Sequence, residues 1–291
     1  MNHISVLYAP ALEHLAIRPD GVYVDATFGA GGHSSGILEQ LGSTGRLIAL
    51  DADPDAVPRA AQIHDPRFTF VSENFRRLDS VLDDLAIGKI DGVLFDLGVS
   101  SMQFDVADRG FSLQQKAPLD MRMNPYTGRS AFDVLEQASE RELADIFYLF
   151  GEERAARRIA HAIVARRENG TLPNTTTEFA GFIAGVLHRP GKRERIHPAT
   201  RVFQALRIAV NEELDALREG IAQAIGRLAS AGRVVAISFH SLEDRIVKQT
   251  FRGDERLSVI TRKPLIPDDA EMMANPRARS AKLRAAERKA S

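Results

Sequence analysis

The chain has 291 residues and is 44% hydrophobic, which is enough to bury one large core and a second, smaller one, so we expect two domains. It has no cysteine, which excludes disulfides, thiolate metal sites and thiol nucleophiles, and no signal peptide or membrane helix is evident, so we expect a cytoplasmic protein without membrane contact. The formal net charge is −1, but the charge is segregated, with aspartate frequent in the first hundred residues and arginine in later segments.

From Gly21 onward, short apolar runs alternate with helical segments. Residues 22–25 and 46–50 are predicted strands, and a glycine-rich turn and a helix lie between them, which makes a βαβ unit. Two further apolar runs, at 68–71 and 92–95, are typical of parallel strands that are buried on both faces. The pattern predicts an α/β fold.

The next predicted strand, residues 233–238, lies far beyond the dozen or so residues that a parallel crossover requires. The intervening sequence has helical periodicity, carried by Leu143, Ile146, Phe147, Phe150, Ile159 and Ile163. We therefore expect an inserted helical domain over residues 110–207 and a discontinuous core domain made of residues 1–109 and 208–291. After the fifth strand, a helix near 242–251 and a short strand near 258–261 can complete the sheet.

The turn at residues 25–34 joins the first strand to a helix, where glycines let the backbone approach a ligand closely. Asp51 ends the second strand, a position from which a carboxylate accepts hydrogen bonds from ribose hydroxyls, although a solvated strand-end aspartate is the alternative. A dinucleotide fingerprint has glycine where this chain has Ser34, so a cofactor without pyrophosphate, such as S-adenosylmethionine, fits better. Asp25 suits an ammonium group or, alternatively, caps the turn.

Three more polar or aromatic positions follow predicted strands. Phe75 is placed to stack on an adenine or to join the core. Asp96 and Gln103 flank the exit of the fourth strand, at the carboxyl edge where open α/β sheets bind ligands.

If the reaction is methyl transfer to a nucleobase, the absence of cysteine leaves transfer to nitrogen or oxygen, because attack at carbon 5 of a pyrimidine ordinarily needs a cysteine nucleophile. Asp96 or the backbone carbonyls at 97–98 are then candidates to accept a hydrogen of the amine.

A base that reacts must leave its stack and needs an aromatic partner, for which Phe104, Phe111 and Phe239 are candidates, each with a core role as the alternative. His240 follows the fifth strand and either orients the substrate or is structural. No group of histidines and carboxylates has metal-ligand spacing, and we expect no metal.

Cations concentrate in the insert and in the C-terminal segment, as phosphate binding requires, although a solvated helix face is the alternative for the insert. The C-terminal segment has little to bury, so we expect a tail that becomes ordered on RNA. The candidate RNA-binding residues are Arg193, Arg195, Arg201, Arg277, Arg279, Lys282 and Arg284.

The blocks at residues 25–34 and 96–103 resemble the bacterial 16S ribosomal RNA (cytosine-N4)-methyltransferase family, RsmH or MraW. Similar blocks follow at 108–112, 118–123, 197–207, 238–244 and 275–284, so the resemblance extends nearly end to end. One departure is at residues 5–8, where the family commonly has Pro-Val-Leu-Leu and this chain has Ser-Val-Leu-Tyr.

The resemblance implies a Rossmann-like class I methyltransferase sheet with an inserted helical domain. It also implies methylation of the N4 amine of a cytidine in the decoding region of 16S ribosomal RNA, within a largely assembled small subunit. The residues that it implies as S-adenosylmethionine contacts are Gly31, Gly32, His33, Asp51, Phe75, Asp96 and Gln103.

Three other readings remain open at this point. They are a methyltransferase of the same class that acts on a protein or small molecule, a nicotinamide dehydrogenase, and a non-enzymatic RNA-binding module. The position of Ser34 disfavours the dehydrogenase, and the arginine-rich insert and C-terminal segment disfavour a small substrate.

Overall fold

A computed structural model describes residues 5–98, 107–188 and 196–290 of the chain. It divides into two compact units: unit 1 comprises Met1–Gly98 and Leu214–Ser291, and unit 2 comprises Val99–Glu213. None of the helices in the described part of the chain is both long and apolar enough to span a membrane.

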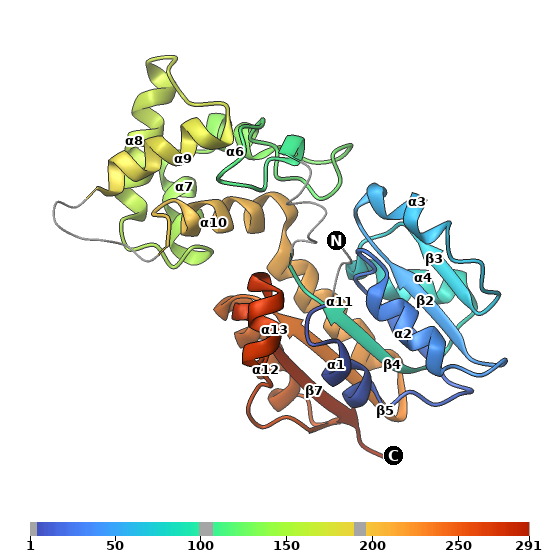
Figure 1. The fold of residues 1–291 in the computed structure, drawn as a ribbon. Helices are drawn as coiled ribbons and strands as arrows, with labels where there is room; N and C mark the ends of the chain where they lie inside the picture. The colour runs from blue at the N-terminus through green and yellow to red at the C-terminus, as the bar shows by residue number, and fades with distance from the viewer. Residues whose placement is uncertain (1–4, 99–106, 189–195, 291) are drawn as a thin grey trace. The chain divides into compact units, whose positions relative to one another are not determined.

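Unit 1 contains a seven-stranded sheet in the order β3-β2-β1-β4-β5-β7-β6 (Figure 1). The strands from β3 to β5 in this order pair in parallel, whereas β7 is antiparallel to both β5 and β6. The order 3-2-1-4-5 is that of a doubly wound Rossmann-like sheet, which confirms the expected fold class. The strands are β1 Val22–Asp25, β2 Arg46–Leu50, β3 Phe68–Val71, β4 Ile90–Asp96, β5 Leu228–Ser238, β6 Leu257–Val259 and β7 Lys282–Arg288.

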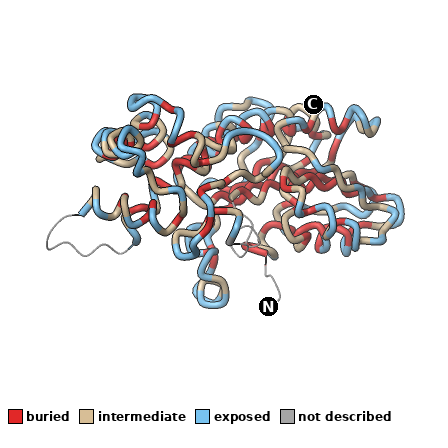
Figure 2. Tube along the Cα trace, turned by 90° about the horizontal axis from the view of Figure 1, so that it is seen from above, coloured by how far each residue is buried: buried red, intermediate tan, exposed pale blue. Residues whose placement is uncertain are grey.

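The central strands are buried because their apolar runs are covered on both faces, as Figure 2 shows by the buried residues along them. In β4, residues from Gly92 to Phe95 are all buried, and polar Asp96 ends the strand. The α-helices of unit 1 are α1 Tyr8–Leu15, α2 Gly32–Gln40, α3 Val57–Ala60, α4 Leu78–Asp84, α11 Glu213–Arg227, α12 Ser241–Gly253 and α13 Asp269–Ala274. The sequence predicted α2 and α12 but not α1.

Unit 2 is helical and has its own core. The helices are α6 Ala131–Gln137, α7 Glu140–Leu149, α8 Ala156–Glu168, α9 Thr176–Leu187 and α10 Thr200–Asn211. Leu143 and Phe147 of α7 pack in one apolar cluster with Ile159 and Ile163 of α8, and all four side chains are fully buried. The helical spacing of these residues in the sequence thus reflects burial on one side of each helix.

The prediction of an RNA-ordered tail is wrong. Residues 282–288 form β7, which lies between β5 and β6, and its Leu283, Ala285 and Ala286 are completely buried. The prediction rested on the many cations of this segment and overlooked its apolar residues, which are the ones that a strand buries at the interior of a sheet. The strand near 258–261 does form, as β6, but it lies at the edge beyond β7.

Candidate active site

The turn between β1 and α2 contains glycines, so its backbone is not covered by side chains at these positions. Gly29 and Gly31 have φ angles of 54° and 81°, in the left-handed region that glycine tolerates best. A Cβ atom on Gly31 would lie 2.9 Å from the Phe28 ring, and one on Gly32 would collide with the hydroxyl of Ser5. A larger residue at either position would therefore disturb the turn, and the divergent block at residues 5–8 packs directly against it.

Asp25 ends β1 as a completely buried carboxylate. Its oxygens accept hydrogen bonds from the Ser34 hydroxyl at 2.7 Å and from the Thr27 amide at 3.2 Å. Burial raises the pKa of Asp25 to about 6 despite these bonds. Ser34, the residue that argued against a dinucleotide fingerprint, is thus the hydroxyl that holds this carboxylate.

Asp51 follows β2 and links the glycine turn to the second strand. Its Oδ2 accepts from the Gly29 amide at 2.7 Å, and its Oδ1 accepts from the Asp53 amide at 2.8 Å. Burial raises its pKa to about 6, and these two bonds counteract the effect only in part. Each oxygen keeps a second lone pair, so the side chain can hold the loop and still accept from ribose hydroxyls.

Asp96 ends β4 beside the same turn, because its amide donates to the hydroxyl oxygen of Thr27 at 2.7 Å. Its Oδ2 lies 3.5 Å from Nδ1 of His33, a buried side chain of α2 that stacks on Tyr8. Oδ1 of Asp96 is shielded from solvent and has no hydrogen-bond partner among residues 5–98, 107–188 and 196–290. A buried acceptor of this kind is costly unless a ligand supplies a donor.

The pKa of Asp96 is raised well above its ordinary range. Burial is the main cause, and the negative charges of Asp25 and Glu243 add to it. A carboxylate that is perturbed in this way, at the carboxyl edge of the sheet, is a candidate for a proton acceptor.

Phe75 lies in a short 3-10 helix, Phe75–Arg77, after β3. Its ring meets Phe95 edge-on, with centroids 5.5 Å apart, and a Cβ atom on Gly220 of α11 would lie 2.6 Å from it. The ring is partly exposed and is fixed in place by these contacts, as a stacking platform requires. Gln103 and Phe104 lie outside the described residues, and Phe111 is buried in the core of unit 2, which excludes it as a stacking partner.

Sequence reasoning missed Glu243, which organises the turn after β5. Its Oε2 accepts from the amides of Phe239 and His240 at 2.7 and 3.2 Å, while Nδ1 of His240 accepts from the Glu243 amide at 3.4 Å. This is a reciprocal capping box at the start of α12, and the glutamate three residues after the N-cap was the signal in the sequence. The Phe239 ring approaches Gly98, so this turn lies beside the end of β4.

A cavity of about 280 Å³ opens at this turn. Phe239 and His240 line it together with Arg279 and Lys282, two of the candidate RNA-binding residues. Ile266 and Met272 add apolar surface. The cavity therefore combines an aromatic ring, apolar walls and two cations in unit 1.

The other candidate RNA-binding residues fall into three groups. Arg277 and, on α10 of unit 2, Arg201 are exposed. Arg193 and Arg195 lie outside the described residues. Arg284 is only 6% exposed and donates to Asp244 at 2.6 Å, so its place in the RNA-binding set is corrected to a structural ion pair between β7 and α12.

The sequence of the whole chain matches a known family. The model of the MraW methylase family covers residues 1–289. The ribosomal RNA small subunit methyltransferase H of Thiobacillus denitrificans is 48% identical over 98% of this chain and 97% of the relative. The protein of the same name from Heliobacterium modesticaldum is 48% identical over 99% of this chain and 98% of its own. A solved rRNA methylase from Streptococcus thermophilus aligns over 99% of both chains with a TM-score of 0.48 and 12% identity.

Proposed function

The chain belongs to the MraW methylase family, and from this premise we propose that it transfers a methyl group from S-adenosylmethionine to the N4 amine of a cytidine in the decoding region of 16S ribosomal RNA. We take the substrate to be a largely assembled small subunit in the cytoplasm. The observation that carries the proposal is the unpartnered, buried Oδ1 of Asp96 beside the glycine turn, in a chain that is 48% identical to ribosomal RNA methyltransferases over nearly its whole length.

The residues present fit S-adenosylmethionine at the carboxyl edge of β1, β2 and β4. The glycine turn leaves room for close approach, Asp51 keeps lone pairs for the ribose, and Phe75 offers a ring for adenine. Asp25 supplies negative charge that suits an ammonium group, because a buried carboxylate is stabilised by a cationic partner, and Asp96 lies beside the same turn. The cofactor, when bound, supplies a methyl group on a positively charged sulfur.

A cytosine amine is a weak nucleophile, because its lone pair is delocalised into the ring. We assign Asp96 the role of accepting one hydrogen of that amine, which orients the nitrogen and localises its lone pair. Transfer of the methyl group to the nitrogen, with loss of its bond to sulfur, would leave an extra proton on the amine, and the carboxylate of Asp96 would accept that proton. The raised pKa of Asp96 makes its carboxylate a better proton acceptor than an exposed one, and positioning of this kind contributes about 7–11 kcal/mol to catalysis in general.

The cavity at the turn after β5 supports binding of the RNA beside this edge of the sheet. Phe239 offers a ring for a base and Arg279 offers charge for phosphate, whereas Nζ of Lys282 lies 3.6 Å from the carboxylate of Asp244. We assign exposed Arg201 and Arg277 to the phosphate backbone as well. Transfer to a protein or a small molecule is not favoured, because both relatives are ribosomal RNA methyltransferases by name.

The test is methyl transfer from labelled S-adenosylmethionine to small ribosomal subunits that lack the modification, followed by mass spectrometry of the nucleosides. We expect N4-methylcytidine from the wild type and none from Asp51→Ala. Label in another nucleoside would contradict the N4 assignment, and transfer to no RNA would contradict the substrate class.

Asp96→Asn tests the assigned base, since it keeps the shape of the side chain and removes its basicity. We expect the rate at saturating substrate to fall by about a hundredfold or more, with cofactor binding measured separately by calorimetry. Asp84→Asn, at an exposed aspartate of α4, is the matched control and should leave the rate unchanged. A rate in Asp96→Asn within a few fold of the wild type would show that Asp96 serves only the cofactor.

A further inference from the structure

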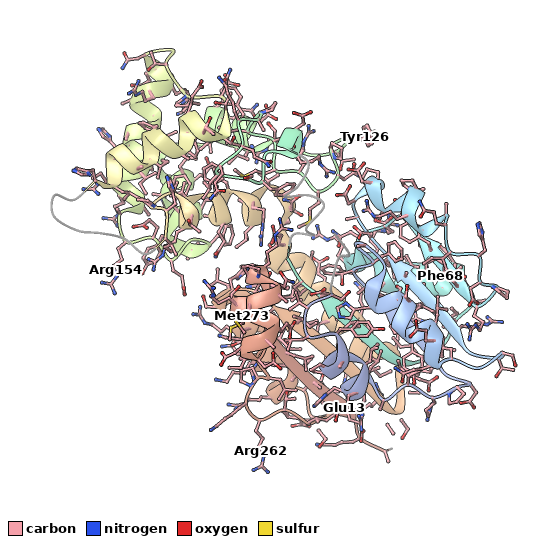
Figure 3. All side chains as sticks on the ribbon, in the orientation of Figure 1. Glu13, Phe68, Tyr126, Arg154, Arg262 and Met273 are labelled. Atoms are coloured by element: carbon pink, nitrogen blue, oxygen red, sulfur yellow. The ribbon has the colours of Figure 1, made fainter. Side chains whose placement is uncertain are left out.

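A loop of unit 2 carries the most exposed large hydrophobic side chain in the described part of the chain. This loop, residues 121–130, precedes α6, and Tyr126 at its tip is 83% exposed (Figure 3). Burial of an aromatic ring usually stabilises a protein, and the ring of Tyr126 makes no such contribution here. Large exposed apolar groups are often binding sites.

The ends of the loop are tied together. The Ala131 amide donates to the Asp120 carbonyl at 2.7 Å, and the Phe132 amide donates to the Leu119 carbonyl at 2.8 Å. At the far end, Ser130 and Asp133 form a capping box that starts α6. A surface loop with its ends held in contact is an Ω-type loop, a class that is frequently functional.

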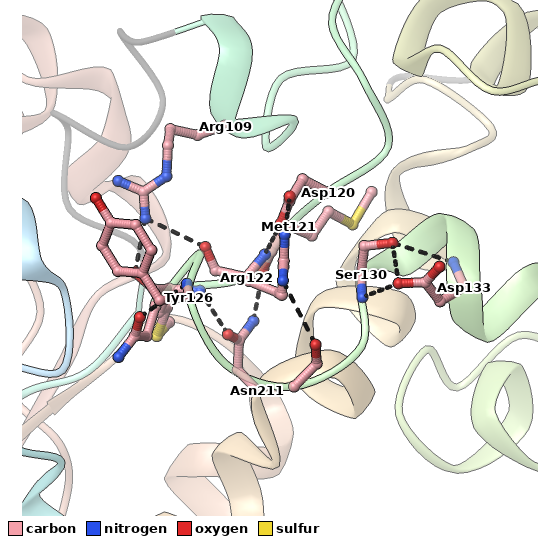
Figure 4. Close-up of polar contacts among 11 residues, drawn as sticks. Arg109, Asp120, Met121, Arg122, Tyr126, Ser130, Asp133 and Asn211 are labelled. Carbon is pink, nitrogen blue, oxygen red and sulfur yellow. Dashed lines mark hydrogen bonds and ion pairs between the residues drawn. The ribbon is translucent and has the colours of Figure 1, made fainter.

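Asn211, the last residue of α10, clamps the first part of the loop, as Figure 4 shows. Its side-chain oxygen accepts from the Met123 amide, and its side-chain nitrogen donates to the Met121 carbonyl, both at 2.7 Å. Met121 is buried and has a φ angle of 61°, which is strained for a side chain of this size. Such strain persists only where the surrounding contacts fix the backbone.

Two arginines complete the clamp. Arg109 donates to the carbonyls of Arg122 and Met123 at 3.2 and 2.6 Å. Arg122 in turn makes a two-pronged contact with Asp120, at 2.8 and 2.7 Å, and reaches the Gly128 carbonyl at 3.4 Å. The loop is therefore rigid at its base while the Tyr126 ring projects into solvent, which is a preorganised arrangement for binding.

The charge of the loop indicates an anionic partner. Residues 121–130 include no acidic residue, and because Arg122 is paired with Asp120, the cation that the loop offers to a partner is the exposed Arg129. An exposed ring with a neighbouring cation is a combination by which proteins bind unpaired nucleotides: the ring stacks on a base and the cation contacts a phosphate.

We propose that Tyr126 stacks on an unpaired base of the RNA substrate, with Arg129 at an adjacent phosphate. The proposal rests on the RNA substrate of the proposed function and extends it to unit 2. Tyr126 is in this view a binding residue that acts on affinity rather than on the chemical step.

Kinetics with undermethylated small subunits form the first test. Tyr126→Ala should raise KM by roughly tenfold and leave kcat unchanged, the size of effect typical of one stacked base, whereas Tyr126→Phe should keep the wild-type KM because the ring remains. Tyr148→Ala is the matched control, since Tyr148 is 63% exposed on α7 of the same unit. An unchanged KM in Tyr126→Ala, or a KM in Tyr126→Phe as high as in Tyr126→Ala, would overturn the stacking role.

A second test needs no methylation. The chain has no tryptophan, so Tyr126→Trp introduces a single fluorophore at the loop tip. Saturating single-stranded oligocytidine should quench its emission by stacking, whereas Tyr148→Trp should show little change. Equal quenching of both variants, or none at 126 when the oligonucleotide is bound, would refute the proposal. Failure of the wild type to methylate subunits would count against the proposed function, and this fluorescence result would still decide whether Tyr126 stacks on RNA.

Discussion

Carboxylates at the carboxyl edge of the sheet and carboxylates in the helical unit differ in their electrostatics. At the edge, burial raises the pKa values of Asp25, Asp51 and Asp96. In the helical unit, hydrogen bonds from Ser130 and Ser139 lower the pKa values of Asp133 and Glu142, which lie at the starts of α6 and α7.

The ionised carboxylates of the helical unit stabilise the fold, whereas those at the edge of the sheet destabilise it. A carboxylate that caps a helix favours the folded state when it is ionised. A buried carboxylate with a raised pKa disfavours the folded state when it is ionised, so its presence at the edge of the sheet has a functional explanation, here a bound cofactor.

The greatest loss of stability is expected where a buried charge loses its ion-pair partner. Asp244→Ala leaves the buried guanidinium of Arg284 without its partner between β7 and α12, and we expect the free energy of unfolding to fall by about 3–5 kcal/mol. Urea denaturation measures it. A loss below about 1 kcal/mol would mean that Arg284 reaches water in solution and that β7 is less buried than the structure indicates.

Asp25→Asn should stabilise the cofactor-free protein. The pKa of Asp25 is about 6 in the folded protein and 3.8 ordinarily. Ionisation of Asp25 therefore lowers the free energy of unfolding as the pH rises from 3.8 to 6, and the loss stays constant at higher pH. The amide carries no charge, so at pH 7.5 we expect a gain on the order of 2–3 kcal/mol, with no gain near pH 3.5 as the internal control. A destabilised variant at pH 7.5 would show that the hydrogen bonds of the carboxylate outweigh its burial.

Binding of S-adenosylmethionine should weaken below pH 6, where Asp25 and Asp51 take up protons. For each carboxylate that must be ionised, the dissociation constant should rise by about tenfold per pH unit below 6 and stay level above it. Calorimetry between pH 5 and 7.5 gives the profile. An affinity that does not change over this range would exclude both carboxylates from the electrostatics of binding.

The smallest effect is expected in the helical unit. Ser130→Ala removes the capping box of α6, and we expect a loss of about 1 kcal/mol. Asp133 has a lowered pKa, so its contribution is present above about 3.8 and is lost as the pH falls further. If Ser130→Ala instead costs as much as Asp244→Ala, the contrast between capping charges and buried charges fails.

The strands from β1 to β5 and the polar residues that follow them could be predicted from local sequence. Strands buried on both faces consist of continuous apolar runs, and the polar residue after each run marks the carboxyl edge, so Asp25, Asp51 and Asp96 could be placed from local pattern alone. The helices of the insert were visible for the same reason, because burial on one side leaves a period in the sequence.

Features that depend on partners distant in the sequence emerged only from the three-dimensional fold. From the sequence, Arg284 was expected to be an exposed cation, but in the fold it is buried and paired with Asp244 of α12, 40 residues away. Nothing in the sequence singles out Tyr126. In the fold, Asn211 and Arg109 hold the base of its loop, and its ring is exposed to water. Local sequence reports the propensity and polarity of a segment, whereas the cost of burying a charge or exposing a ring depends on neighbours that the fold brings together.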